Sequence, residues 1–275
     1  MIALIERQKM NAYRQLSSVP LGKRTAGNEN TGLLKLFAIL FMIVDHVSVV
    51  FFPTVLEMRL IGRIAFPLFA WCLCVGVEYT KNPWKYALRL LAVGVLSQPI
   101  YVFAMTHKWG DLNIFFELLL GLAALEAVRW NKWGSRYWGP AAAVLLACVP
   151  NLNYSYGWKG IVLILILYAC RKDRAALAGA LFAFCLFWGQ GSSQPARLFG
   201  VPLPDAIPFL PRTGELLSAI FRIQFWGVLA LPFIIYPSKG RFLLPQWVSY
   251  AAYPAHLLVL GVLRHWGEIT SFFSR

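Results

Sequence analysis

Ionisable side chains interrupt three of the most apolar stretches of this chain. The stretch "FMIVDHVSVVFF" contains Asp45 and His46, "IGRIAFPLFA" contains Arg63, and "YAAYPAHLLVLG" contains His256. An imidazole is a base near neutral pH, and a guanidinium keeps its charge in apolar surroundings. Inside a membrane helix each charge costs about 2.5 to 3.5 kcal/mol, so we expect each to have a partner or a function. These residue types favour proton transfer and the stabilisation of negative charge.

The composition places these residues in a membrane protein. Of the 275 residues, 59% are hydrophobic and 14% are charged, and the mean hydropathy is +0.59. An ordinary soluble domain has roughly 25% charged residues. The formal net charge of +14 comes from short basic clusters between apolar segments, a pattern that does not favour a nucleic-acid-binding face.

Apolar segments long enough to cross a bilayer recur along the chain. They predict an all-α fold, a polytopic transmembrane helical bundle of about nine spans. The fifth segment is short and ends in "CVPN", so it is also compatible with a broken or re-entrant segment. The predicted spans are 33–52, 60–77, 86–104, 112–128, 138–150, 155–170, 175–190, 219–236 and 246–264.

The distribution of Lys and Arg predicts a cytoplasmic N-terminus. With that orientation, sixteen of these residues fall in inner segments and seven in outer ones, in keeping with the positive-inside rule. Residues 1–32 then form a basic cytoplasmic N-terminal tail, and 33–265 form the transmembrane domain. The proline-rich stretch 191–217 becomes an outer loop that either shapes the choice of acceptor or simply connects helices.

Polar residues from six predicted spans lie at a similar depth, slightly to the outer side of the midplane. With a rise of about 1.5 Å per residue, each lies roughly 10 to 15 residues from the inner end of its helix. Structural hydrogen bonding between helices is the competing interpretation, and an internal ion pair between Glu117 and Arg222 is another. The residues of this layer are His46, Arg63, Gln98, Asn113, Glu117, Arg222 and His256.

The sequence gives no sign of a metal site. No histidines recur at i, i+4 spacing, and the carboxylates are scattered. No cysteine pair has C-x-x-C spacing, and all the cysteines fall in predicted helices, where we expect them to be buried apolar side chains. They are Cys72, Cys74, Cys148, Cys170 and Cys185.

Five ordered blocks of the sequence resemble the TraX family. They are "LLKLFAILFMIVDHVSVVFF", "IGRIAFPLFA", "NIFFELLLGL", "SYGWKGIVLILILYACR" and "YPAHLLVLGVL". This family of conjugation-associated membrane proteins is linked to N-terminal acetylation of F-pilin, and it is similar to the wider group of transmembrane acyltransferases. The resemblance implies an inner-membrane acetyltransferase that uses acetyl-CoA. The pilin, or another membrane-associated acceptor, would then be its partner.

The same resemblance implies a set of functional positions, one block after another. Glu117 is not among them. The positions are Lys35, Asp45, His46, Gly62, Arg63, Phe66, Pro67, Asn113, Tyr156, Gly157 and His256.

These positions suggest a mechanism for acetyl transfer. The acceptor loses a proton as it attacks the thioester, and His46 is our expected base, with His256 as the alternative. Adjacent helix positions point about 100° apart, so we expect Asp45 to pair with Lys35 or an arginine of the second span instead of facing the substrate. Arg63 would stabilise the developing oxyanion or hold an acceptor carboxylate.

The cofactor-binding residues are predicted from charge and from the resemblance. Acetyl-CoA carries phosphates that suit a basic inner surface, and its thioester must reach roughly 20 Å inward to His46. The expected cofactor-binding residues are Lys35, Arg59, Lys81, Lys85, Arg89 and Asn113.

Two other functions fit the same residues. An O-acetyltransferase for a cell-surface glycan would use the same chemistry on a hydroxyl group. A non-enzymatic transporter would use the polar layer as an intramembrane relay, although the sequence contains no evident inverted repeat.

Overall fold

The computed structural model confirms that the chain is predominantly helical. It describes residues 24–190, 197–198, 201–202, 220, 222–238, 240 and 242–266. The helices are α2 (Thr31–Phe51), α3 (Leu56–Gly62), α4 (Ala65–Tyr79), α5 (Pro83–Met105), α6 (Ile114–Trp130), α7 (Ser135–Leu146), α8 (Gly157–Ala169), α9 (Arg174–Gln190), the 3₁₀ helix η1 (Ile223–Ala230), α11 (Leu231–Ile235) and α12 (Gln246–Arg264).

Two short pairs of strands complete the described structure. β1 (Asp111–Leu112) pairs in parallel with β2 (Asn153–Tyr154), so the segment before α6 lies beside the segment before α8. β3 (Arg197–Leu198) pairs with β4 (Val201–Pro202) in antiparallel fashion, and the rest of the predicted outer loop 191–217 lies outside the described residues.

The helices follow the order of the predicted spans, with two changes in shape. The second predicted span is divided into α3 and α4, and the eighth is a 3₁₀ helix followed by the short α11. Within the described residues, three helical stretches are long and apolar enough to cross a membrane: Thr31–Phe51, Leu56–Tyr79 and Pro83–Met105. This finding fits a membrane protein, and nine spans stay a prediction.

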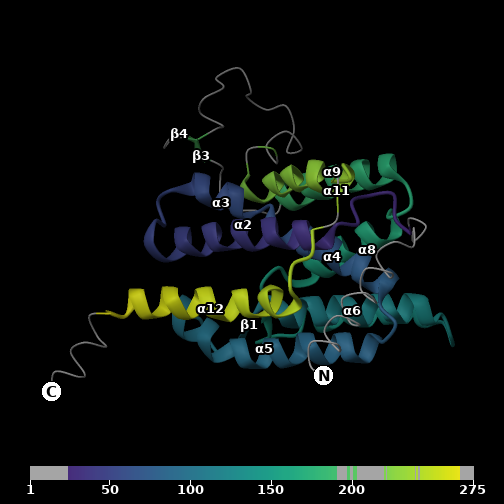
Figure 1. Cartoon of the computed structure of the whole chain (residues 1–275), viewed down its shortest axis with the longest axis horizontal. Helices are drawn as coiled ribbons and strands as arrows, with labels where there is room; N and C mark the ends of the chain where they lie inside the picture. The colour runs from purple at the N-terminus through teal and green to yellow at the C-terminus, as the bar shows by residue number, and fades with distance from the viewer. Residues whose placement is uncertain are drawn as a thin grey trace, which may run out of the picture.

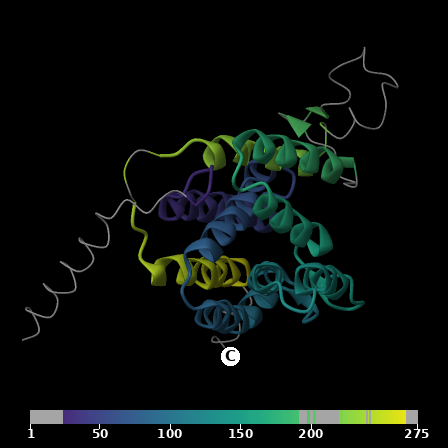
Figure 2. The same cartoon turned by 90° about the vertical axis from the view of Figure 1, so that its right-hand side faces the viewer.

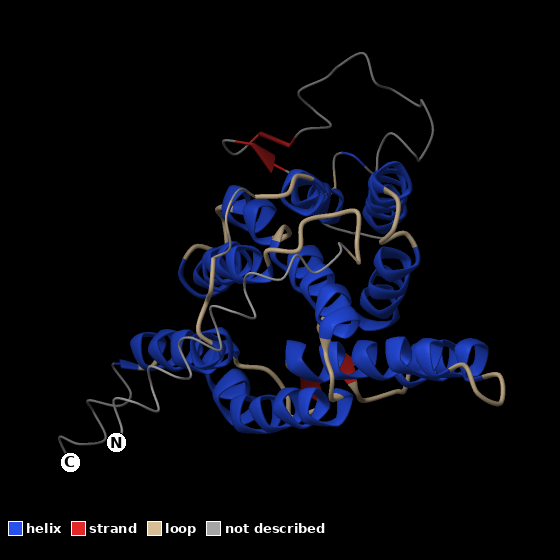
Figure 3. Cartoon of the chain, turned by 45° about the vertical axis from the view of Figure 1, so that its right-hand side comes forward, coloured by secondary structure: helices blue, strands red, loops and turns tan. Residues whose placement is uncertain are grey.

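The most enclosed helix, α4, lies between two groups of helices (Figures 1 and 2). α2, α3 and α9 lie on one side of it, and α5, α6 and α12 lie on the other, as Figure 3 also shows. α2 packs along α4, and α12 packs along both α5 and α2. The two groups are thereby joined through α4 and through the contact between α2 and α12.

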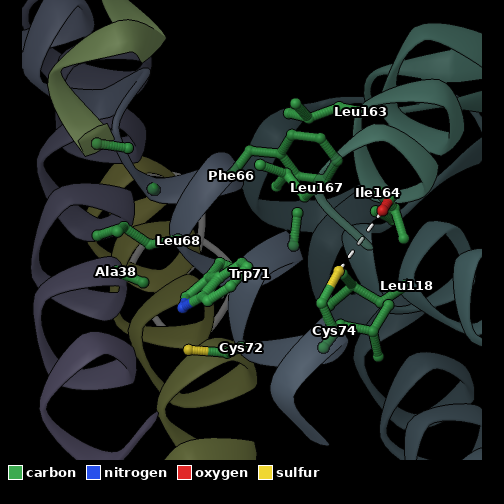
Figure 4. Packing of buried hydrophobic residues seen from close by; sticks show 14 of the residues in the cluster. Ala38, Phe66, Leu68, Trp71, Cys72, Cys74, Leu118, Leu163, Ile164 and Leu167 are labelled. Atoms are coloured by element: carbon green, nitrogen blue, oxygen red, sulfur yellow. Dashed lines mark hydrogen bonds between the residues drawn. The ribbon is translucent and has the colours of Figure 1, made fainter. Parts of the chain in front are cut away.

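The core around α4 is built from large apolar side chains. Phe66, Leu68 and Trp71 are almost fully buried, and Figure 4 shows them among residues of α2, α6 and α8. Cys74 on the same helix donates to the carbonyl of Ile164, at 3.5 Å. Because lipid is as apolar as these side chains, close packing stabilises such a core more than removal from water does.

Part of the predicted N-terminal tail is instead packed against the bundle. The backbone N–H of Asn28 donates to the carbonyl of Ile234 at 2.6 Å, and Trp71 Nε1 donates to the carbonyl of Asn28 at 2.7 Å. Thr25 and Asn28 are buried, so the tail predicted over 1–32 was too long. Residues 1–23 lie outside the described part of the chain.

One of the expected buried cysteines is on the surface. Cys148 is exposed because it lies in the turn that follows α7, and the predicted helix over 138–150 was too long. Cys72, Cys74 and Cys185 are buried as expected, and Cys170 is partly exposed.

Replacing Trp71 with alanine should strongly destabilise the protein. The indole is fully buried and its N–H is hydrogen-bonded, so we expect a loss of about 3 to 5 kcal/mol, seen as a lower midpoint of thermal unfolding in detergent. Trp84→Ala is the matched control because this side chain is 85% exposed. Equal effects of the two substitutions would contradict the packing described here.

Candidate active site

Some of the polar residues singled out in the sequence, Asp45, His46 and Arg63 among them, line a cavity of about 410 Å³, here called the central cavity. Its walls come from α2, the junction between α3 and α4, the end of α5, the β1–β2 pair and α12. The polar and aromatic residues that line it include Asp45, His46, Arg59, Arg63, Tyr101, His107, Asp111, Asn153, Ser155, Tyr156 and Tyr253.

The two histidines that were alternative bases contact each other. Nδ1 of His46 lies 2.7 Å from Nε2 of His256, and Nδ1 of His256 lies 2.8 Å from the carbonyl oxygen of Ala252. A carbonyl only accepts, so we assign the His256 proton to Nδ1, which makes its Nε2 the acceptor for the Nδ1 proton of His46. In the neutral pair, Nε2 of His46 therefore keeps a free lone pair. His46 itself lines the central cavity.

Asp45 is paired with an arginine of the second predicted span, as expected. Its Oδ1 lies 2.5 Å from the Nη2 of Arg63 and 4.0 Å from the Nε of Arg59. The expectation that Asp45 faces away from the site was wrong, because both Asp45 and His46 line the central cavity. The cavity is wide enough to include two neighbouring faces of α2.

The break between α3 and α4 brings Arg63 to this position. Pro67 has no N–H, so it cannot donate to the carbonyl of Arg63 as a helical residue would. Gly62 allows α3 to approach α2 closely, since a Cβ atom there would overlap the side chain of Asp45. The sequence "IGRIAFP" therefore produces both the break and the close contact that the ion pair requires.

Two buried N–H groups, on Arg59 and Arg63, have no hydrogen-bond acceptor within the described residues. Arg63 is only 8% exposed, and within the described part of the chain its Nε and that of Arg59 have no hydrogen-bond partner. A buried N–H without a partner carries a desolvation cost, so an unmade bond at this place indicates a ligand or ordered water.

Asn113 does not line the central cavity but organises its wall. Its Nδ2 donates to the carbonyl of Gly94 and to Gln98 Oε1, and its Oδ1 caps α6 by accepting from the N–H of Phe115. Gln98 in turn donates to the carbonyl of Asp111 at 2.8 Å. We had expected Asn113 to bind the cofactor. Its amide is instead fully used in these hydrogen bonds and has no exposed surface, so Asn113 holds β1 in place.

Glu117 is held by the backbone and not by Arg222. Its Oε2 accepts from the N–H of Tyr156 at 2.9 Å, and its side chain is fully buried against Gly160. This contact fixes the start of α8, which carries Tyr156 to the central cavity.

Two smaller cavities continue from the central one along the bundle. The first, called the neck, has about 60 Å³ and shares Met42, Phe69, Ile114 and Tyr253 with the central cavity. The second, called the mouth, has about 270 Å³. It shares its border with the neck at Lys35, Tyr86, Ser249 and Tyr250. Because successive cavities share lining residues, they lie in a row, here called the passage, from the start of α2 to His46.

The predicted phosphate-binding cluster is only partly at the mouth. Lys35 and Arg89 line it, whereas Lys81 and Lys85 are exposed on the surface and do not. Arg89 lies one turn farther along α5 than Lys85 and packs over the ring of Tyr86, at 5.8 Å, while Lys81 precedes the helix. Arg59 lies at the opposite end, beside Asp45.

Residues that the sequence analysis did not select also reach the central cavity. His107 lines it together with Asp111, Tyr101 and Ser155. Two distant loops meet here through the β1–β2 pair, and nothing in either loop alone indicates this pairing. No group of three His, Cys, Asp or Glu residues suited to a metal ion occurs within the described ranges.

Comparisons with known proteins give a consistent result. The family model described as "TraX protein" matches residues 30–264. "Protein TraX" of Escherichia coli is 29% identical over 240 residues, which cover 84% of this chain and 86% of the relative. The "Probable fimbrial assembly protein FimC, serogroup H1" of Dichelobacter nodosus is 26% identical over 243 residues, covering 82% and 92%. No solved structure matches significantly.

Substituting Gly62 should disturb the site more than a typical helical glycine would. In Gly62→Ala the new methyl group overlaps Asp45, so we expect a loss of about 1 to 3 kcal/mol in unfolding free energy. Thermal unfolding in detergent measures the effect. Gly179→Ala is the control, because a Cβ there meets nothing within 4 Å and should leave stability unchanged or higher. Equal stability of the two variants would rule out the close contact between α2 and α3.

Proposed function

Because the chain belongs to the TraX family, we propose that it is an inner-membrane acetyltransferase that transfers an acetyl group from acetyl-CoA to the N-terminal amine of a pilin subunit. The relative named as a fimbrial assembly protein supports an acceptor that belongs to a surface filament. The observation that carries the proposal is the free Nε2 of His46 in a cavity that a narrow neck connects to a basic mouth.

The shape of the passage suits acetyl-CoA. Lys35 and Arg89 at the mouth would bind its phosphates, while the mostly apolar neck admits only a thin chain such as the arm that bears the thioester. Lys35 and His46 lie on the same helix, about 16 Å apart by helical rise. The substrate supplies an activated acetyl group, and the protein holds its charged end far from the reacting end.

The residues of the central cavity then have separate roles. Nε2 of His46 accepts a proton from the attacking acceptor, and His256 holds the ring in the tautomer that leaves Nε2 free. Arg63 supplies positive charge and an unused N–H for the developing oxyanion. Asp45 keeps that guanidinium in position through its ion pair.

The proposed orientation places the mouth on the cytoplasmic side, where acetyl-CoA is made. The end of the bundle that carries His107 and the β1–β2 pair would face the outer side, as the distribution of Lys and Arg predicts. A membrane-associated acceptor would then reach His46 from the side opposite to the coenzyme.

Removal of the proposed base should abolish acetyl transfer. The purified protein in detergent, given labelled acetyl-CoA and a peptide with a free N-terminal amine, should label the peptide. His46→Ala should lower kcat/KM by about 100-fold or more. His265→Ala, at another histidine that does not line the central cavity, is the control. A transporter would consume no acetyl-CoA, and a glycan acetyltransferase would require a sugar acceptor.

A second prediction concerns the mouth. Lys35→Ala should raise the KM for acetyl-CoA about tenfold with little change in kcat, since the lost contact lies far from the reacting carbonyl. Lys85→Ala should leave both constants unchanged, because this side chain is exposed outside the mouth. Initial rates at varied acetyl-CoA concentration measure the difference, and equal KM values for the two variants would place the coenzyme elsewhere.

A further inference from the structure

A second histidine on the wall of the central cavity is arranged like a catalytic base. Nδ1 of His107 lies 3.3 Å from Oδ2 of Asp111, and the imidazole stacks on the ring of Tyr101 with centroids 4.9 Å apart. When Nδ1 carries the proton and faces the carboxylate, Nε2 is free to accept one. Its side chain is 39% exposed, so a proton taken up here can pass to water.

The carboxylate beside His107 is itself held in place. Asp111 Oδ1 accepts from Asn153 Nδ2 at 2.8 Å, and Oδ2 accepts from the backbone N–H of Lys108 at 2.9 Å. The carbonyl of Asp111 accepts from Gln98. The hydrogen bond from Asn153, followed by that from Lys108, lowers the pKa of Asp111, so the group remains an anion over the whole range in which histidine titrates.

The reaction proposed above needs a base in addition to His46. An N-terminal amine arrives mainly as an ammonium ion and must lose one proton before its nitrogen has a lone pair. The neutral amine then attacks the carbonyl carbon, the C–N bond forms and the C–S bond breaks. During this step a second proton leaves the nitrogen, passes to His46 Nε2 and ends on the sulfur of the coenzyme. One proton is released overall, whereas a hydroxyl acceptor releases none.

Resting on the proposed function, we infer that His107, oriented by Asp111, removes the first proton from an entering ammonium group. His46, paired with His256, handles the second proton at the reacting carbon. Both histidines line the same cavity, on walls formed by α2 and by the segment after α5.

The other charged groups near His107 do not take its place as the base for the first proton. The positive charges of Arg59 and Arg63 at the cavity are next to Asp45. Besides these, the titratable or charged groups on the same loop, on the cavity wall or at the neighbouring helix end are Lys108, Asp111, Tyr101, Tyr154, Tyr156, Tyr253, His46 and Arg264. Of these, Asp111 is the anion that lies beside the imidazole.

The test compares two acceptors that differ in one group. One peptide carries an N-terminal amine, and the other carries a hydroxyl in its place; initial rates are measured from pH 6 to 9.5 with labelled acetyl-CoA. An N-terminal amine has a pKa near 8, so about one molecule in ten is neutral at pH 7 without help. In His107→Gln the rate with the amine should fall about tenfold at pH 7 and match the wild type at pH 9.5, where the amine is already neutral.

Three comparisons decide the outcome. The hydroxyl peptide should react equally with His107→Gln and the wild type, and His265→Gln should behave as the wild type with both peptides. An unchanged amine rate at pH 6 to 7, or an equal loss at every pH and with both peptides, overturns the role of His107. A wild type that transfers acetyl groups only to the hydroxyl peptide overturns the proposed amine acceptor. A wild type that consumes no acetyl-CoA overturns the proposed function itself, and this is visible without any variant.

Discussion

A carboxylate and a guanidinium inside an apolar bundle persist as a pair, because either charge alone would be buried without compensation. Asp45 and Arg63 form such a pair, and it joins α2 to the break between α3 and α4. The stretch Leu56–Tyr79, which contains α3 and α4, is the most enclosed of the three long apolar stretches within the described residues, so the pair fixes α2 to the most enclosed part of the bundle. The position of His46, one residue after Asp45, follows from this attachment.

Another wall of the central cavity is held in place by hydrogen bonds from side-chain amides instead. Gln98 and Asn113 hold the irregular backbone before α6, and Asn153 joins it to β2. Irregular backbone is tolerated at membrane depth where it lines a cavity and its polar groups are paired. The site therefore lies between a charged wall that carries His46 and an amide-rich wall next to which His107 lies.

Much of the helical fold and the pairing of Asp45 follow from the sequence, because apolar length predicts helices and a buried charge requires a partner. The same arguments misplaced Asn113, since an amide at a helix start can cap the helix or contact a ligand, and the sequence does not distinguish these roles. They also missed His107, whose position depends on the β1–β2 pairing of Asp111 with Asn153, residues far apart in the chain. Lys81 and Lys85 were grouped with Arg89 by charge alone, although Lys81 precedes α5 and Lys85 lies one turn before Arg89, so neither lines the mouth.

The partners of the two histidines explain why each histidine would accept a different proton of the ammonium group. His46 contacts a neutral imidazole, which stabilises a positive charge on the ring less than an anion would, so a proton on His46 is readily passed on to a leaving sulfur. His107 contacts a carboxylate and is partly exposed to solvent, an arrangement that orients the ring and lets its proton exchange with water. Two bases with such different surroundings in one cavity are more than a hydroxyl acceptor requires, and they match the two protons that an ammonium group must lose.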